Sequence, residues 1–316
     1  MGKRSGQAVR NRNAQTPPEP PEPLRVAVGD SHTHMDMQTP EVAEIIAAAE
    51  AVGVTPLMQV GVDVASSQWA AEVADRHPGQ VWAAVALHPN EAPRIVHGDG
   101  APGVEVDDTD WAGKVRPPGG RAGLEEALAE IDRLAALPRV RAVGETGLDY
   151  FRTGEEGVRA QQESFRRHID IAKRHGRALM IHDRDAHDDV LSVLAEEGAP
   201  ETVVFHCFSG DADMAKVCAE HGYYMSFAGN VTFASAEPLR EAAAAAPPEL
   251  VLVETDAPFL TPKPYRGRPN APYLIPYTLR ALAEVKGMAE DDLAATVAAN
   301  GRRAFRLDSA PESPRE

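Results

Sequence analysis

Two histidines two positions apart, His32 and His34 in the stretch DSHTHMD (residues 30–36), are the first residues whose spacing suggests chemistry. Side chains at alternate positions of a β-strand point to the same face, so the two imidazoles can converge on one metal ion. A polar strand end with two solvated histidines would give the same pattern. The motif therefore favours a metal site only if the rest of the chain supplies further ligands.

Four more residues of metal-ligand type follow β-rich runs further along the chain. They are Glu145 in AVGETGLDY, His182 in ALMIHDRD, His206 in VVFHCFSG and Asp256 in LVLVETDAPFL. Taken singly, each has an ordinary explanation, such as a hydrogen-bonded loop histidine or a carboxylate in a turn. Together, four imidazoles and two carboxylates at equivalent positions match a binuclear metal site with a bridging carboxylate. The set as a whole therefore favours the metal site.

The elements that would have to position these residues alternate regularly. Short runs rich in β-branched residues are separated by segments whose apolar residues recur at three- and four-residue spacing, often closed by glycine. Eight such units predict a single-domain α/β fold, a (β/α)8 TIM barrel over residues 25–307, with catalytic groups at the carboxyl ends of its strands. A doubly wound open sheet is the alternative, because periodicity does not show closure. The predicted strands are residues 25–30, 54–63, 81–88, 140–145, 178–182, 202–206, 223–229 and 250–255.

The segments outside these units are polar or irregular. Residues 1–24 form a proline-rich stretch and residues 308–316 a similar one, which predicts two disordered tails. Residues 92–123, after the third strand, form a long loop insertion. Long loops without structure are often lids, so we expect this one to overhang the catalytic face; a solvated insert without effect is the alternative. Acidic residues beside Trp111 at its centre would favour short substrates or strand ends over long duplex DNA.

The bulk composition limits the classes of function. The net charge of −16 argues against a broad, non-specific grip on nucleic acid, but it permits a compact site where metal ions and a few arginines carry positive charge. No apolar run approaches the roughly 18 residues of a membrane span, and the polar amino terminus does not read as a secretory signal. Cys207 and Cys218 are too few for a disulfide framework. We therefore predict a cytoplasmic protein without a membrane partner.

The motifs DSHTHMD, GETGLDY, IHDRDAHDD, HCFSG, ETDAPFL and RGRPNAP together resemble the TatD family of metal-dependent hydrolases, within the amidohydrolase superfamily. The resemblance covers roughly residues 28–306 and implies a TIM barrel that binds two divalent metal ions. The ligands that it implies are His32, His34 and Asp256 for one ion and His182 and His206 for the other, with Glu145 bridging them.

The resemblance also implies a class of substrate. Several members of the family act as DNases, including 3′→5′ exonucleases, and at least one branch is associated with removing D-amino acids from tRNA. A nucleic acid partner, in the form of single-stranded DNA or strand ends, is therefore implied. Relatives of the phosphotriesterase type bridge their metals with a modified lysine near the fourth strand. This chain has Glu145 there and no lysine, which favours the TatD-like interpretation.

Two divalent ions about 3.5–4 Å apart can activate a bridging water and polarise a phosphoryl oxygen. We expect in-line attack on a phosphodiester, with Asp256 accepting or steering the water proton and Glu145 as the second catalytic residue. The same site would cleave a carboxylic ester, so a D-aminoacyl-tRNA deacylase or another small-ester hydrolase is the alternative. A barrel that only binds is disfavoured by the complete ligand set. Such ligands accept Mg, Mn, Zn or Co, which leaves the metal open.

Phosphate recognition is expected from the strand-end loops, because arginine binds phosphate bidentately. Arg184 could instead form a structural ion pair with the aspartates that follow it. His88 could contact the phosphate or only end a turn, and this chain has Asn90 where many relatives carry a second histidine. Tyr150 and Phe151 could stack a base or pack into the core. The predicted substrate-binding residues are His88, Arg152, Arg184 and Arg266.

Overall fold

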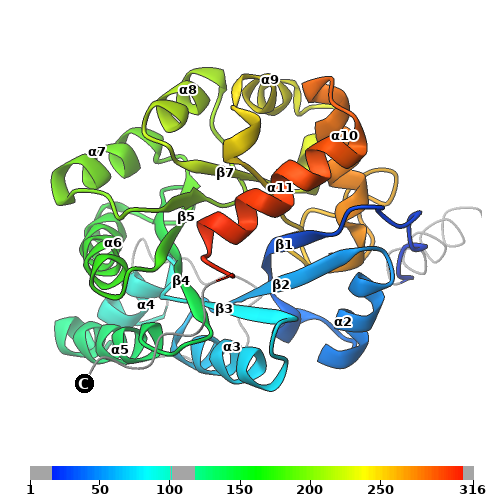
Figure 1. The fold of residues 1–316 in the computed structure, drawn as a ribbon. Helices are drawn as coiled ribbons and strands as arrows, with labels where there is room; N and C mark the ends of the chain where they lie inside the picture. Colours follow the sequence, from blue (N-terminus) through cyan, green and yellow to red (C-terminus); the bar gives the residue numbers. More distant parts are fainter. Residues whose placement is uncertain (1–15, 100, 102–117, 309–316) are drawn as a thin grey trace, which may run out of the picture.

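The computed structural model describes residues 16–99, 101 and 118–308 and arranges parallel strands in a ring, with helices around the outside (Figure 1). Each strand pairs with the next one along the chain, from β1 to β8. A doubly wound sheet would reverse its strand order part-way, so the TIM-barrel prediction is confirmed. The strands are β1 (Val28–Thr33), β2 (Val54–Val60), β3 (Val81–Val85), β4 (Val140–Asp149), β5 (Ala178–Arg184), β6 (Val203–Phe205), β7 (Tyr224–Phe227) and β8 (Val251–Val253).

The helices pack against the outside of the barrel because each helix has one apolar face to bury. In α6, Phe165, Ile169 and Ala172 recur at four- and three-residue spacing and are buried against the barrel. Gly176 ends this helix with a φ of 58°, a left-handed conformation that glycine adopts without strain. The helices are α2 (Val42–Glu50), α3 (Val64–Arg76), α4 (Glu91–His97), α5 (Gly120–Ala135), α6 (Glu155–His175), α7 (His187–Glu197), α8 (Ala212–Glu220), α9 (Glu237–Ala245), α10 (Ile275–Lys286) and α11 (Glu290–Ala304), with short 3-10 turns at η1 (Met35–Met37), η2 (Gly229–Thr232), η3 (Pro248–Leu250) and η4 (Pro272–Leu274).

The ring closes between β1 and the segment that follows β8. The N–H of Asp256 donates to the carbonyl of His32 at 2.9 Å, and the N–H of His34 donates to the carbonyl of Ala257 at 2.9 Å. Deeper in the barrel, the Asp30 carboxylate accepts the N–H of Thr255 at 3.0 Å and lies 2.5 Å from its hydroxyl. Closure therefore brings the first predicted ligands of the chain beside the last one.

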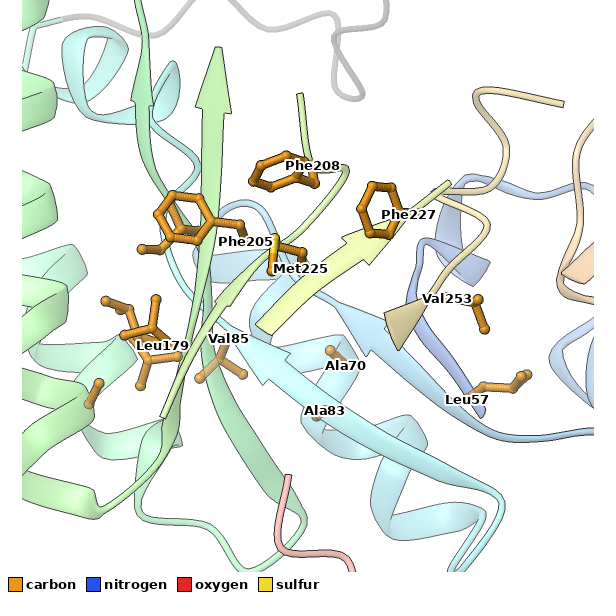
Figure 2. Close-up of a cluster of buried hydrophobic side chains, with 14 of the residues drawn as sticks. Leu57, Ala70, Ala83, Val85, Leu179, Phe205, Phe208, Met225, Phe227 and Val253 are labelled. Atoms are coloured by element: carbon orange, nitrogen blue, oxygen red, sulfur yellow. The ribbon is translucent and has the colours of Figure 1, made fainter. Parts of the chain in front are cut away.

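Apolar side chains pack in two layers. The inner layer fills the barrel with Met58, Trp82, Met180 and Leu252, and Phe305 at the end of α11 joins it. Helix α11 crosses one end of the ring (Figure 1). The outer layer lies between the strands and the surrounding helices, and Figure 2 shows part of it. Since the interior is a packed core, the open carboxyl ends of the strands are left for the site.

The expected insertion after the third strand is partly helical. Helix α4 begins at Glu91, so the first residues of the 92–123 stretch are not an unstructured loop. Pro93 lies in the first turn of this helix, where its missing N–H is tolerated, although proline reads as a breaker in the sequence. Residues 102–117, including Trp111, lie outside the described residues, so the lid stays a prediction.

Residues 16–24, expected to be part of a disordered tail, lie along the barrel. The Arg268 guanidinium donates to the carbonyls of Thr16 and Pro17 at 2.8 and 2.6 Å. The Tyr273 hydroxyl donates to the carbonyl of Pro18 at 2.8 Å. Ordered structure therefore begins before residue 25, whereas residues 1–15 and 309–316 lie outside the described residues. Within the described part, no helix is long and apolar enough to cross a membrane.

Candidate metal centre

The six predicted ligands meet at the carboxyl ends of the strands. This is the end of a barrel at which TIM-barrel enzymes carry their active sites. Each ligand has a ring nitrogen or a carboxylate oxygen within 4 Å of another member of the set. Their positions are His32 in β1, His34 directly after it, Glu145 in β4, His182 in β5, His206 directly after β6 and Asp256 after β8.

Four of these side chains form what we call the four-donor group. The Nε2 atoms of His32 and His34 lie 3.1 Å apart. Glu145 Oε1 lies 3.6 and 3.5 Å from these two nitrogens, and Asp256 Oδ1 lies 3.7 and 3.6 Å from them. Ligands bonded to one ion at about 2.0–2.1 Å in tetrahedral geometry are about 3.4 Å apart. The separations therefore fit donors that share one metal ion.

Three side chains form a second cluster, the three-donor group. Glu145 Oε2 lies 2.8 Å from His206 Nε2 and 3.2 Å from His182 Nδ1, and the two ring nitrogens lie 3.4 Å apart. Glu145 thus offers Oε1 to the four-donor group and Oε2 to the three-donor group. This is the placement that a bridging carboxylate requires, and the donor set fits two ions.

Outer contacts orient the histidine rings. The His34 Nδ1 atom lies 3.1 Å from the carbonyl of Val60, so it carries the proton and leaves Nε2 free to act as a ligand. The His206 ring is held in the same way, because its Nδ1 lies 3.2 Å from Glu254 Oε1. Such contacts fix which nitrogen faces the site, and they are characteristic of metal-binding histidines.

Glu254 is a site residue that the sequence analysis did not assign. It is fully buried, and its Oε1 accepts the N–H of Cys207 at 2.8 Å. Its Oε2 has no hydrogen-bond partner among the described residues, and the side chain groups with His32 and His206 as a possible ligand set. A buried carboxylate oxygen without a partner is costly, which fits a nearby cation. The alternation applied to His32 and His34 would have found Glu254, two positions before Asp256.

Asp149 is the second residue that was missed. Its Oδ2 lies 3.3 Å from His182 Nε2, on the far side of the ring from Glu145, and accepts a hydrogen bond from the Asn90 amide at 3.1 Å. Although burial raises its pKa, the hydrogen bond and charge of His182 lower it to about 2. The carboxylate is therefore ionised and holds the imidazole in place. Asp149 lies four positions after Glu145, so strand alternation also predicts that the two share a face.

Strand β4 carries both Glu145 and Asp149 because it extends to residue 149, beyond the predicted end at residue 145. The β4–β5 register shifts between Val143 and Thr146, where β4 has one residue more than its partner, and such a bulge re-aims a side chain. Gly147 has a φ of 139°, and a Cβ there would lie 2.1 Å from the carbonyl oxygen of His182. Only glycine therefore allows β4 to continue past this point to Asp149.

His88, a predicted substrate residue, lies at the edge of the three-donor group. Its Nδ1 accepts the N–H of Asn90 at 3.1 Å, so Nε2 carries the proton and points toward Glu145 Oε2, 4.0 Å away. Burial and the positive charge of His182 lower the pKa of His88 to about 3. The ring is thus neutral at pH 7 and can donate a hydrogen bond to a ligand.

The predicted phosphate-binding arginines lie at the end of β5 (Arg184) or on loops after strands, and two of them lie against aromatic rings. The Arg184 guanidinium lies 3.8 Å from the centroid of the Phe151 ring, and Arg266 lies 4.4 Å from that of Phe233. Among the described residues, neither has an ion pair with a carboxylate, so Arg184 does not pair with the aspartates that follow it. Arg152 is half-buried on the loop after β4.

The sequence matches the family model "TatD related DNase" over residues 29–306. The chain belongs to the TatD family. An "uncharacterized metal-dependent hydrolase TatD" from Mycobacterium tuberculosis is 42% identical over 286 residues, which cover 88% of this chain and 97% of the relative. A "3′-5′ ssDNA/RNA exonuclease TatD" from Erwinia billingiae is 31% identical, over 84% of this chain and 92% of the relative.

A solved TatD structure has the same fold. The crystal structure of YjjV, a TatD homologue from Escherichia coli, superposes with a TM-score of 0.71 at 25% identity, over 88% of this chain and 98% of that one. The predicted family is confirmed, and this TatD protein is a metal-dependent hydrolase.

Proposed function

We propose that this TatD protein hydrolyses phosphodiester bonds in single-stranded nucleic acid, using two divalent metal ions. The observation that carries the proposal is the placement of Glu145, whose two oxygens face two separate donor groups. Two-metal sites with a shared ligand are typical of phosphatases and nucleases. The name of the Erwinia relative, a single-strand DNA and RNA exonuclease, supports the choice of substrate.

The four-donor group would hold one ion and the three-donor group the other, with Glu145 common to both. When bound, such ions supply an activated water and neutralise charge on the phosphoryl oxygens. Asp256 would accept a hydrogen bond from the attacking water. Burial raises the pKa of Asp256, but its hydrogen bond to His34 and the nearby imidazoles lower it, so the carboxylate is ionised at neutral pH.

The other polar groups at the mouth would bind the substrate. The His88 Nε2–H can donate to a phosphoryl oxygen. Arg184 and Arg266 carry charges that no described carboxylate neutralises, and Arg152 lies on the adjoining loop. In a chain with a net charge of −16, these cations would attract the phosphates next to the bond that is cleaved. We also propose a cytoplasmic location, which matches the two free cysteines.

The experiment that tests the proposal compares three substrates: 5′-labelled single-stranded DNA, the matching RNA, and D-aminoacyl-tRNA. The protein is stripped with EDTA and then reloaded separately with Mg, Mn, Co or Zn. We expect metal-dependent shortening of the single strands and no activity in EDTA. Deacylation of the tRNA without cleavage of either strand would overturn the proposal in favour of an ester hydrolase.

A further inference from the structure

Two phenylalanines at the mouth of the barrel are unusually exposed. Phe151 is 58% exposed and Phe259 is 40% exposed, and within the described part of the chain these are the two large apolar side chains that face solvent. Single apolar residues on a surface need no explanation. These two, however, lie on the segments that follow β4 and β8, at the end of the barrel that carries the donor groups.

Phe259 stands against the four-donor group. Its ring centroid lies 6.4 Å from that of His34, with the two planes 73° apart. Its N–H donates to the carbonyl of Asp256 at 2.8 Å, and the Asn270 amide donates to its carbonyl. The backbone is thus fixed on both sides, and the ring lies beside His34, one of the proposed ligands.

Phe151 stands beside the three-donor group. Its N–H donates at 3.0 Å to Asp149, the carboxylate that orients His182. The neighbouring Tyr150 is half-buried and donates its hydroxyl to Asp189 at 2.7 Å, so of the two aromatic residues only Phe151 is exposed. The Arg184 guanidinium stacks on the Phe151 ring and adds a positive charge to the same surface.

From these positions we propose that Phe151 and Phe259 are base-stacking platforms for the two nucleotides that flank the scissile phosphate. In a ring of strands ordered β1 to β8, β4 and β8 are opposite each other. Phe259 lies beside the four-donor group and Phe151 beside the residue that orients His182 in the three-donor group, and Glu145 offers one carboxylate oxygen to each group. Aromatic rings bind bases of any sequence by stacking, and a positive charge nearby suits the backbone. The inference rests on the proposed function and specifies how the substrate is held.

The arrangement also discriminates between single and double strands. Neighbouring bases in a duplex stay stacked about 3.4 Å apart, which leaves no room for a metal centre between them. Two platforms beside different donor groups require the flanking nucleotides to be splayed apart, which only a single strand or a frayed end allows. Selection for single strands then follows from the shape of the mouth, without base-specific contacts.

The test is a double-mutant cycle that combines protein variants with abasic substrates. The wild type, Phe151→Leu and Phe259→Leu are loaded with metal and given single-stranded DNA, either intact or with an abasic residue on one or the other side of the cleaved bond. Leucine keeps apolar bulk and removes the ring. Phe151→Tyr and Phe259→Tyr are the matched controls that keep it. Metal content is measured for every variant, since stacking variants should retain both ions.

Base stacking is worth about 1–3 kcal/mol, which corresponds to about 5- to 150-fold in kcat/KM. We expect each leucine variant to lose this factor on intact DNA and to become insensitive to the abasic residue on one side only. The tyrosine variants should behave like the wild type. If the leucine variants are as sensitive to both abasic sites as the wild type, the stacking role is wrong although the protein is a nuclease. If the wild type cleaves no single strand, the proposed function fails and the platforms fail with it.

Discussion

His168 on α6 should make the barrel sensitive to acid. The ring is fully buried, with Nδ1 2.7 Å from the carbonyl of Ser164 and Nε2 accepting the N–H of Leu87 at 3.0 Å. Both nitrogens are thus satisfied in the neutral ring, and a second ring proton would face the Leu87 N–H. Burial lowers the pKa of His168 from 6.5 to about 4. Since the folded state binds this proton less readily than the unfolded chain, the stabilisation is complete above pH 6.5 and is lost as the pH falls toward 4.

The interval between the two pKa values, at about 1.4 kcal/mol per unit, amounts to about 3 kcal/mol of unfolding free energy. The control is His168→Gln, whose amide oxygen can accept the Leu87 N–H and which does not titrate. Urea unfolding of metal-free protein is followed by circular dichroism from pH 7 to pH 4, so that protons do not compete with metal. The wild type should lose about 3 kcal/mol more than the variant over this range. Parallel losses would refute the assignment of His168 as a buried neutral ring.

Three predictions concern the metal centre. Glu145→Gln should weaken binding of at least one ion and lower turnover by several orders of magnitude; two bound metals with near-normal activity would exclude bridging. Asp256→Asn should lower kcat by about 10²–10⁴ with little change in KM, whereas a change confined to KM would make Asp256 a binding residue. Asp149→Asn should weaken metal binding by about 10- to 100-fold, because His182 loses a charged partner, and competition with a chromophoric chelator measures this.

Most of the barrel could be predicted from local sequence, because each unit repeats the same two periodicities. The eight strands and the six proposed ligands followed from β-rich runs and from the residues placed after them, whereas the structure was needed to exclude a doubly wound sheet. The length of β4 could not be predicted. The predicted strand ends at residue 145, before Gly147, and the close approach of β5 that requires glycine at position 147 exists only in the folded protein.

Contacts between segments that are distant along the chain could not be predicted from the sequence either. The stacking of Arg184 on Phe151 joins the end of β5 to the loop after β4, and neither local sequence indicates the other. Asp149 and Glu254, by contrast, could have been predicted, since strand alternation puts them on the same faces as Glu145 and Asp256. The motifs GETGLDY and ETDAPFL each hold two acidic residues on one strand face, and only Glu145 and Asp256 were predicted as ligands. Because side chains at every second strand position share a face, the positions of Glu145 and Asp256 predict that Asp149 and Glu254 also face the site.

The closure of the ring between β1 and β8 also determines when the centre can form as the chain is synthesised. Asp30 and Thr255, which join at this seam, are 225 positions apart. The three-donor group draws on the middle of the chain, but the four-donor group needs His32 and Asp256 together. A nascent chain therefore lacks the four-donor group until almost all of the barrel has left the ribosome. Incomplete translation products should therefore lack hydrolase activity.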